Sequence, residues 1–271
     1  MRIPSDPVLR GRAWTGLLVA GIAVCAGGPL VALGAASLSR AWFYPDLLPR
    51  HLDLSAWQDL LGAGGPLPAA LLNSLVLATT CAALSALLGA PAARALASLR
   101  GSRAGALKGA LVVLPVLPPV LLGAGTHYFF LATALAGTLP AVLLAHLMIT
   151  LPYATIVLLG AVRTTDPRLE AVAATLGASS TRRAWRVRVP LLWPSLLLVL
   201  LFSFLISWGQ YGLTLVVGEG RIQTLPTLVF SYVRGGNETY AAVAGVLMAL
   251  PALLGAPLLG RGLARVRPGA W

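Results

Sequence analysis

The residues best suited to chemistry in this chain are few and stand far apart. All eight Asp and Glu residues lie between or outside the apolar runs of the sequence, so these runs hold no carboxylate to carry a coupling ion. Within the apolar runs, His146 shares a helical face with Thr150 and Tyr153, at positions i, i+4 and i+7. Two interpretations remain open for His146: a hydrogen-bonding residue between helices, or a proton relay.

The sequence offers no catalytic or metal-binding pattern. The single lysine, Lys108, follows GSRAGAL, which does not form the glycine cradle of a P-loop. No serine elbow or aspartate pair is present, and two Cys and three scattered His make no ligand spacing. We therefore predict that this chain is not an enzyme and binds neither metal nor nucleotide. If ATP drives it, another subunit binds the ATP.

The elements that must position these residues are long apolar helices. Hydrophobic residues make up 58% of the 271 and charged residues 10%, and the mean hydropathy is +0.84. Such a composition is typical of a membrane protein, and continuous apolar runs favour helices over a β-barrel. The fold class is all-α, a polytopic membrane protein with six transmembrane helices. The predicted spans are 13–36, 69–91, 109–132, 139–162, 191–217 and 240–260.

Charge predicts the orientation of these spans. Sixteen of the 20 Lys and Arg residues fall at the two termini and in the second and fourth loops, on one side of the predicted membrane. The positive-inside rule then places both termini in the cytoplasm of a multi-pass protein in a bacterial-type inner membrane. With no soluble domain to carry them, these basic residues do not indicate nucleic-acid binding. The first apolar stretch, Trp14 to Leu33, exceeds the core of a signal peptide and predicts a retained helix.

Three further segments have local signals. Between the first two spans, LSAWQDLL predicts a short amphipathic helix at the outer surface, either an interfacial anchor or part of a docking site. Prolines at 115, 118 and 119 predict a kink in the third span, which either packs against neighbours or lines a wet or moving region. Residues 218–240 have turn signals at both ends and predict an external loop that contains a short helix, either re-entrant or interfacial.

The fourth loop, at 163–190, has the pattern of a capped helix-turn-helix. Asp166 and Pro167 predict the start of a short helix, and Gly177 predicts its end. Ser179 or Ser180 can cap a second, arginine-rich segment, which we expect Pro190 to separate from the fifth span. Exposed alanines allow close approach, and arginines bind carboxylates of a partner. A loop that only sets the membrane topology would explain the arginines, but not the helix caps at Asp166 and Gly177 or the proline at 190.

DPRLEAVAATLGASSTRRAWRVRVPLL resembles the EAA loop of permease subunits of binding-protein-dependent ABC importers. Gly177 matches the family glycine, and Pro190 stands thirteen residues on, where the family proline is expected. The position of the usual glutamate holds Ala171, and Glu170 lies one residue early. Either Glu170 takes its place or the partner contact relies on shape. Stretches at 71–97 and 203–247 are also similar to these permeases, in particular to the polyamine, thiamine and ferric-iron group.

The resemblance implies the type I ABC importer permease fold and a transporter with several subunits. We expect 1–68 to form an N-terminal helix and external segment, 69–262 the permease core and 263–271 a cytoplasmic tail. Implied partners are an ABC ATPase dimer, which binds ATP and Mg, an external solute-binding protein, the lipid bilayer and a second permease. The displaced glutamate favours a paralogue as that second permease. This chain itself is expected to bind no cofactor.

Two sets of residues follow from the resemblance. Residues expected to couple to the ATPase are Glu170, Ala171, Ala173, Ala174, Gly177, Ala178, Arg182, Arg183 and Pro190. Residues expected along the translocation path are Asn73, Thr80, His146, Thr150, Tyr153, Ser203, Ser207 and Gln210, of which the last three share one face of the fifth span. Hydrogen bonding between helices is the other interpretation of each path residue. The alternative function is a secondary transporter or channel that works without ATP.

Overall fold

The computed structural model describes residues 7–39, 42, 46, 48–49 and 51–264. The predicted cytoplasmic tail lies outside these residues, except for its first two positions. Several basic residues of the charge argument also lie outside them: Arg2, Arg40, Arg50, Arg265 and Arg267.

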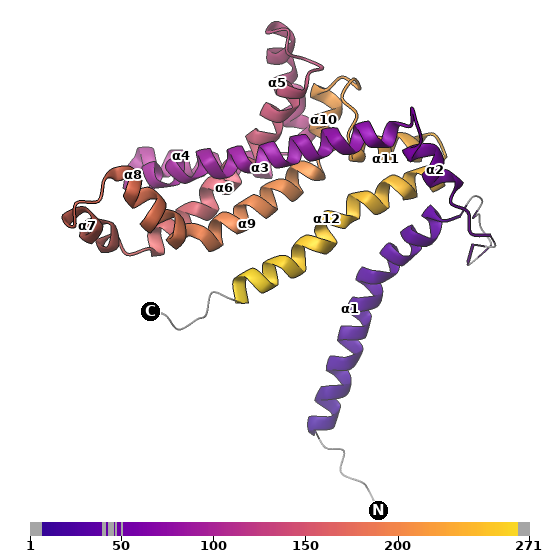
Figure 1. Cartoon of the computed structure of the whole chain (residues 1–271), viewed down its shortest axis with the longest axis horizontal. Coiled ribbons are helices and arrows are strands. Elements are labelled where there is room, and N and C mark those ends of the chain that lie inside the picture. Colours follow the sequence, from indigo (N-terminus) through magenta and orange to yellow (C-terminus); the bar gives the residue numbers. More distant parts are fainter. Residues whose placement is uncertain (1–6, 40–41, 43–45, 47, 50, 265–271) are drawn as a thin grey trace, which may run out of the picture. The chain divides into compact units, whose positions relative to one another are not determined.

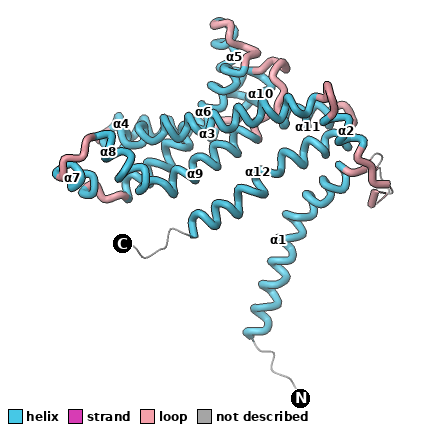
Figure 2. Tube along the Cα trace, in the orientation of Figure 1, coloured by secondary structure: helices cyan, strands magenta, loops and turns pink. Residues whose placement is uncertain are grey.

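Helices form nearly all of the described structure, with one isolated β-bridge between Ser39 and Leu52 (Figure 2). In chain order they are α1 (Pro7–Ser37), α2 (Ser55–Leu61), α3 (Pro66–Ser98), α4 (Ser102–Val116), α5 (Pro119–Ala132), α6 (Leu139–Thr164), α7 (Arg168–Thr175), α8 (Ser180–Arg183), the π-helix η1 (Ala184–Arg188), α9 (Val189–Trp208), α10 (Gly212–Val217), α11 (Leu225–Arg234) and α12 (Glu238–Ala264). The all-helical prediction is confirmed.

Five helical segments are long and apolar enough to cross a membrane. They are Leu18–Ser37, Pro66–Ser98, Leu139–Thr164, Ser180–Trp208 and Glu238–Gly255. A sixth candidate is the bent pair Ala104–Val116 and Pro119–Ala132, whose two helices meet at 105°. Each of the six predicted apolar windows therefore corresponds to one of these segments, and the third is not a single straight helix.

The break in the third window lies between α4 and α5. Leu117 and Pro118 both have extended backbone, with ψ of 140° and 129°. Each precedes a proline, and the proline ring disfavours helical backbone at the residue before it. Two such residues in a row end α4 completely, so the predicted kink is a sharp turn that leads into α5 (Figure 1).

The fifth predicted window also ends early. Helix α9 stops at Trp208, and α10 begins at Gly212 after a short non-helical link. The indole Nε1 of Trp208 donates a hydrogen bond of 2.9 Å to the carbonyl of Met248 in α12. Gln210 lies in the link, so its predicted place on one face with Ser203 and Ser207 is wrong. Hydropathy does not reveal this break, because the apolar run continues through α10.

The described chain divides into two compact units. One comprises 68–228 and the chain from Met248 onward. In this unit α6 is the central helix: more of it is buried than of any other candidate span. Its apolar side chains pack with α3, α5 and α10 in one cluster and with α3 and α9 in another. At Gly89 of α3, an added Cβ would lie 3.2 Å from the Cβ of Ala154 in α6, so these two helices cross closely.

The other unit comprises the chain up to Leu67 and Val229–Leu247. It confirms the predicted short helix after the first span, α2, whose first turn is capped by Asp53 through a 2.7 Å bond from the backbone N–H of Ser55. The hydroxyl of Tyr240, in α12, donates a 2.8 Å bond to Asp59 of α2. The short helix expected within 218–240 is also present, as α11.

Candidate coupling loop and polar core

The loop between α6 and α9 folds as a capped helix-turn-helix (Figure 1). The carboxylate of Asp166 accepts a 2.9 Å bond from the backbone N–H of Arg168, at the start of α7. Gly177 ends α7 with φ of +77°, and the N–H of Ala178 bonds back to the carbonyl of Ala173 at 3.0 Å. This is a Schellman cap, which requires left-handed backbone that glycine adopts without strain. The predicted start and end of α7 are confirmed.

The second arm differs from its prediction. Ser179, one of the two candidates, caps it through a 3.3 Å bond from the N–H of Arg182. Pro190 does not separate this arm from the fifth span, because α8, η1 and α9 follow one another without a break. In η1 the backbone widens, and the N–H of Val189 bonds to the carbonyl of Ala184, five residues earlier. The helix thus passes into α9, and Pro190, the second residue of α9, lies directly after this widened turn.

The predicted coupling residues lie mainly on the surface of this loop. Ala171, Ala174, Gly177, Arg182 and Pro190 are exposed, and Ala173, Ala178 and Arg183 are half-buried. Sequence reasoning missed three large apolar side chains of the first arm: Leu169, Val172 and Leu176 are 43%, 56% and 82% exposed. Helix α7 buries none of its residues. An apolar helix surface of this kind is typical of a site that binds another protein.

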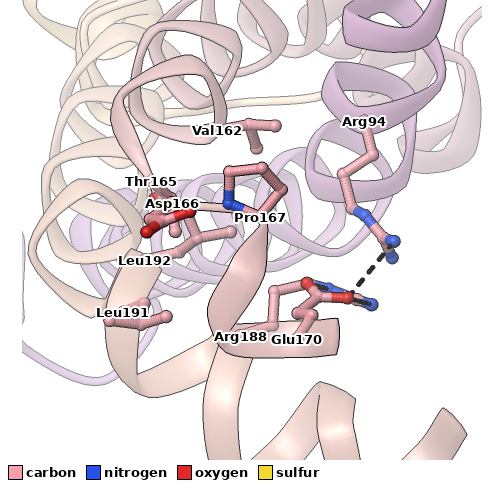
Figure 3. A pocket seen from close by; sticks show the side chains of 9 residues that line it. All are labelled: Arg94, Val162, Thr165, Asp166, Pro167, Glu170, Arg188, Leu191 and Leu192. Carbon is pink, nitrogen blue, oxygen red and sulfur yellow. Dashed lines mark hydrogen bonds and ion pairs between the residues drawn. The ribbon is translucent and has the colours of Figure 1, made fainter. Parts of the chain in front are cut away.

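Glu170 faces the transmembrane helices. Its carboxylate accepts two bonds from Arg188 of η1, from Nε to Oε1 and from Nη2 to Oε2, each of 2.8 Å. Arg94 of α3 lies 3.8 Å from Oε2 (Figure 3). The hydrogen bonds from Arg188 hold the pKa of the Glu170 carboxyl below its usual range, and the positive charges of Arg188, Arg94 and Arg183 act in the same direction. Sequence reasoning missed both pairings.

A cleft of about 200 Å³ adjoins this cluster. Its lining residues are Arg94, Val162, Thr165, Asp166, Pro167, Glu170, Arg188, Leu191 and Leu192 (Figure 3). They come from the ends of α3, α6 and α9, from η1, and from α7 with the segment before it. The coupling loop therefore meets the ends of three transmembrane helices at a charged cluster rather than through a packed apolar core.

Several predicted path residues form a neutral polar core inside the bundle. The imidazole of His146, in α6, is 1% exposed and lies between two hydroxyl groups. Nδ1 is 2.8 Å from Ser207 Oγ in α9, and Nε2 is 3.0 Å from Thr214 Oγ1 in α10. Thr150 accepts a 2.8 Å bond from Ser85 in α3, and Cys81 Sγ lies 3.1 Å from the same hydroxyl. These contacts support the hydrogen-bonding interpretation of His146, Thr150 and Ser207.

The remaining path candidates lie outside this core. The amide of Asn73 donates a 2.9 Å bond to the carbonyl of Gln223, and Thr80 is half-buried. The ring of Tyr153 packs against Phe202, with centroids 6.0 Å apart. Ser203 is fully buried, and its hydroxyl has no hydrogen-bond partner among the described residues. Their role in translocation stays a prediction.

Comparison with known proteins identifies the class. Residues 67–265 match the family described as the binding-protein-dependent transport system inner membrane component. The chain belongs to this family, as the loop and fold indicate. It is the permease subunit of a binding-protein-dependent ABC importer, a multi-pass inner membrane protein that is not itself catalytic. The alternative of a transporter or channel without ATP is set aside.

Individual relatives share the class and differ in their named substrates. The chain is 38% identical over 191 residues to the molybdenum transport system permease protein ModB of Mycobacterium tuberculosis, covering 65% of this chain and 71% of ModB. It is 27% identical over 180 residues to the spermidine/putrescine transport system permease protein PotC of Haemophilus influenzae, covering 66% and 70%. A bacterial ABC transporter that imports the acidic polysaccharide alginate has the same fold, with a TM-score of 0.75, 18% identity and coverage of 96% and 99%.

Proposed function

We propose that residues 166–190 form the surface through which this permease binds and is driven by a separate ATPase. The observation that carries the proposal is α7 itself: a helix capped at both ends, with no buried residue and with Leu169, Val172 and Leu176 exposed. A short helix that buries none of its apolar side chains within its own chain needs a partner to cover them. In this proposal the partner ATPase dimer binds ATP and Mg, and the permease binds no cofactor.

The position of the loop supports transmission into the membrane. It connects α6 and α9, which pack against one another through Leu158 and Val199. A displacement of α7 therefore acts on two transmembrane helices at once, as in rigid-body switching between two packed states. We further propose that both termini lie in the cytoplasm with this loop, in keeping with its basic residues.

For the substrate, we propose a small solute of the polyamine, thiamine or ferric-iron type, delivered by the binding protein. The stretch from Trp208 to Thr227 supports this group, and PotC is one relative named for polyamines. The eight candidate residues of the translocation path carry no fixed charge. One of them, Gln210, lies beyond the end of α9. Selectivity then belongs to the binding protein. We also propose that the second permease is a paralogue of this chain, because the glutamate of the loop is displaced by one residue from its usual position.

Uptake measurements test the substrate proposal. Cells that lack their own importers for these solutes would express this permease with its neighbouring transporter genes and receive labelled spermidine, thiamine, ferric iron or molybdate. We expect ATP-dependent uptake of one of the first three. Uptake of molybdate alone would assign the chain to the substrate named for ModB and overturn the proposed group.

Co-purification from detergent-solubilised native membranes tests the coupling surface. We would compare the wild type with Gly177→Arg and identify the ATPase and its activity in each sample. Gly101→Arg is a matched control: Gly101 also has positive φ, of +82°, and open space around it, but it lies between α3 and α4. We expect the ATPase with the wild type and with Gly101→Arg, and its loss with Gly177→Arg. Equal ATPase in all three samples would remove the loop from the interface.

A further inference from the structure

The position of Glu170 differs from that of an interface residue. It is the third residue of α7, and its side chain is 29% exposed. On the same helix Val172 is 56% exposed, and Leu176, the residue directly after the helix, is 82% exposed. The carboxylate of Glu170 faces the cleft at the ends of the transmembrane helices, whereas these apolar side chains lie on the open surface. The charged and the apolar groups of α7 thus serve different contacts.

The contact that Glu170 makes is already complete. Both carboxylate oxygens accept a bond from one guanidinium, that of Arg188, in the parallel two-bond arrangement that is the strongest ion pair available to these groups. Arg94 approaches Oε2 from α3 at 3.8 Å (Figure 3). Three segments that are far apart in sequence therefore meet at one carboxylate: α3, α7 and η1, which leads directly into α9.

Little else fixes α7 to the bundle at this point. The helix has no buried residue, and the space beside Glu170 is a cleft rather than packed side chains. Apolar contact cannot transmit a force where the surfaces do not touch. The ion pairs of Glu170 cross this gap, and a bidentate pair also fixes direction, which a single flexible contact does not.

We propose that Glu170 is a positioning residue, which clamps the coupling helix to Arg188 at the start of α9 and to Arg94 of α3 and does not contact the ATPase. This inference rests on the proposed function, because a clamp transmits motion only if a partner moves α7. The apolar surface of α7 binds the ATPase, and the clamp passes the displacement to the transmembrane helices. Loss of the clamp then separates ATP hydrolysis from transport without removing the ATPase.

The test uses the complete transporter, reconstituted in proteoliposomes with its ATPase and binding protein. We would measure ATP hydrolysis, solute uptake and the uptake per ATP hydrolysed for Glu170→Gln, Arg188→Glu and the double reversal Glu170→Arg/Arg188→Glu. For both single variants we expect the ATPase to stay bound and uptake per ATP to fall about tenfold, the size of an ordinary coupling free energy. In the double reversal the pair with position 188 can re-form, but Arg94 then faces a like charge, so we expect partial recovery, with uptake per ATP above that of Arg188→Glu alone.

Two further variants keep the result interpretable. Arg188→Lys retains the charge but not the two parallel bonds, so we expect a partial loss of uptake per ATP in a protein that still folds. Arg163→Gln removes an exposed arginine at the end of α6, outside the clamp, and should leave uptake per ATP unchanged. If Arg188→Glu aggregates, the comparison of Arg188→Lys with Glu170→Gln carries the test.

Three results would overturn the clamp. The first is loss of the ATPase from Glu170→Gln while Arg188→Lys retains it. The second is wild-type uptake per ATP in both of these variants. The third is a folded double reversal whose uptake per ATP is no higher than that of Arg188→Glu alone. The first would show that Glu170 contacts the ATPase directly. Absence of the ATPase from the wild-type complex is a different outcome, because it would refute the proposed function on which the clamp rests.

Discussion

Replacement of His146 by leucine tests the neutral polar core. The imidazole bonds to Ser207 in α9 at 2.8 Å and to Thr214 in α10 at 3.0 Å, and the substitution removes both bonds. Leucine is apolar and of similar size, so the loss is one of hydrogen bonding rather than of packing. Hydrogen bonds between membrane helices contribute about 0.6 kcal/mol each on average. Two of them give about 1.2 kcal/mol, which is about an eightfold change in an unfolding equilibrium.

The two cysteines provide the assay. Cys25 is exposed and would be replaced by serine, whereas Cys81 is fully buried beside Thr150 in the same core. A buried thiol reacts with an alkylating reagent only when the helices around it separate. The fraction of Cys81 labelled would be measured over increasing SDS in mixed micelles, to obtain the unfolding equilibrium of the bundle.

We expect His146→Leu to raise the unfolded fraction about eightfold at a fixed SDS concentration in the transition, in line with two lost bonds. His146→Gln retains a donor and an acceptor and should have a smaller effect. The reasoning fails if His146→Leu labels like the wild type, since the two bonds would then contribute nothing. It fails also if His146→Gln is as unstable as His146→Leu, because shape rather than hydrogen bonding would then be responsible.

Two further predictions concern the coupling loop. Gly177→Ala should destabilise the loop by about 1–2 kcal/mol, because φ is +77° there; an added Cβ meets no other atom, so the cost is that of the backbone alone. The affinity for the ATPase should then fall several-fold. Gly177→Asn should bind the ATPase nearly as the wild type does, because asparagine tolerates this backbone. The pKa of Glu170 is lowered by Arg188, so the pair stabilises the loop above the ordinary carboxyl pKa and is lost as the pH falls through the lowered value. Hydrogen-exchange protection of α7 should therefore be constant from about pH 8 to 6 and fall only below about pH 4. A fall in protection between pH 7 and 6 would contradict this. So would an equal loss of protection at acid pH in Glu170→Gln, which lacks the carboxylate.

The sequence predicted elements whose signals are local. The caps at Asp166 and Gly177 act through their own backbone neighbours, and both are present in the structure. Ser179 and Ser180 could not be separated, because either hydroxyl reaches the first free N–H groups of a following helix. Pro190 was expected to separate the second arm from the fifth span, and instead it lies near the start of α9 in a helix that continues through the π-helix before it.

The remaining features depend on contacts across the bundle. Leu117 and Pro118 end α4 through local backbone geometry, but the packing of α5 against α10, which is far along the chain, had no signal in the sequence. Gln210 leaves the face of Ser203 and Ser207 because α9 ends at Trp208, inside a continuous apolar run. The pairing of Glu170 with Arg188 spans 18 residues. Opposite charges on the two arms of a helix-turn-helix were its only local signal, and six arginines in that loop left the partner undetermined.

The hairpin of α6 and α9 is fixed at three levels. Away from the loop, His146 of α6 bonds to Ser207 of α9. Along the middle, Leu158 and Val199 are fully buried in one apolar cluster. At the loop, Arg188 joins the start of α9 to the coupling helix through Glu170. Two helices that are bonded at one end and packed along their middle move together, because close-packed interiors resist local deformation, and the clamp joins this pair to the coupling helix. A displacement of the coupling helix would therefore tilt the hairpin as a unit, and with the clamp removed the same displacement would bend only the loop.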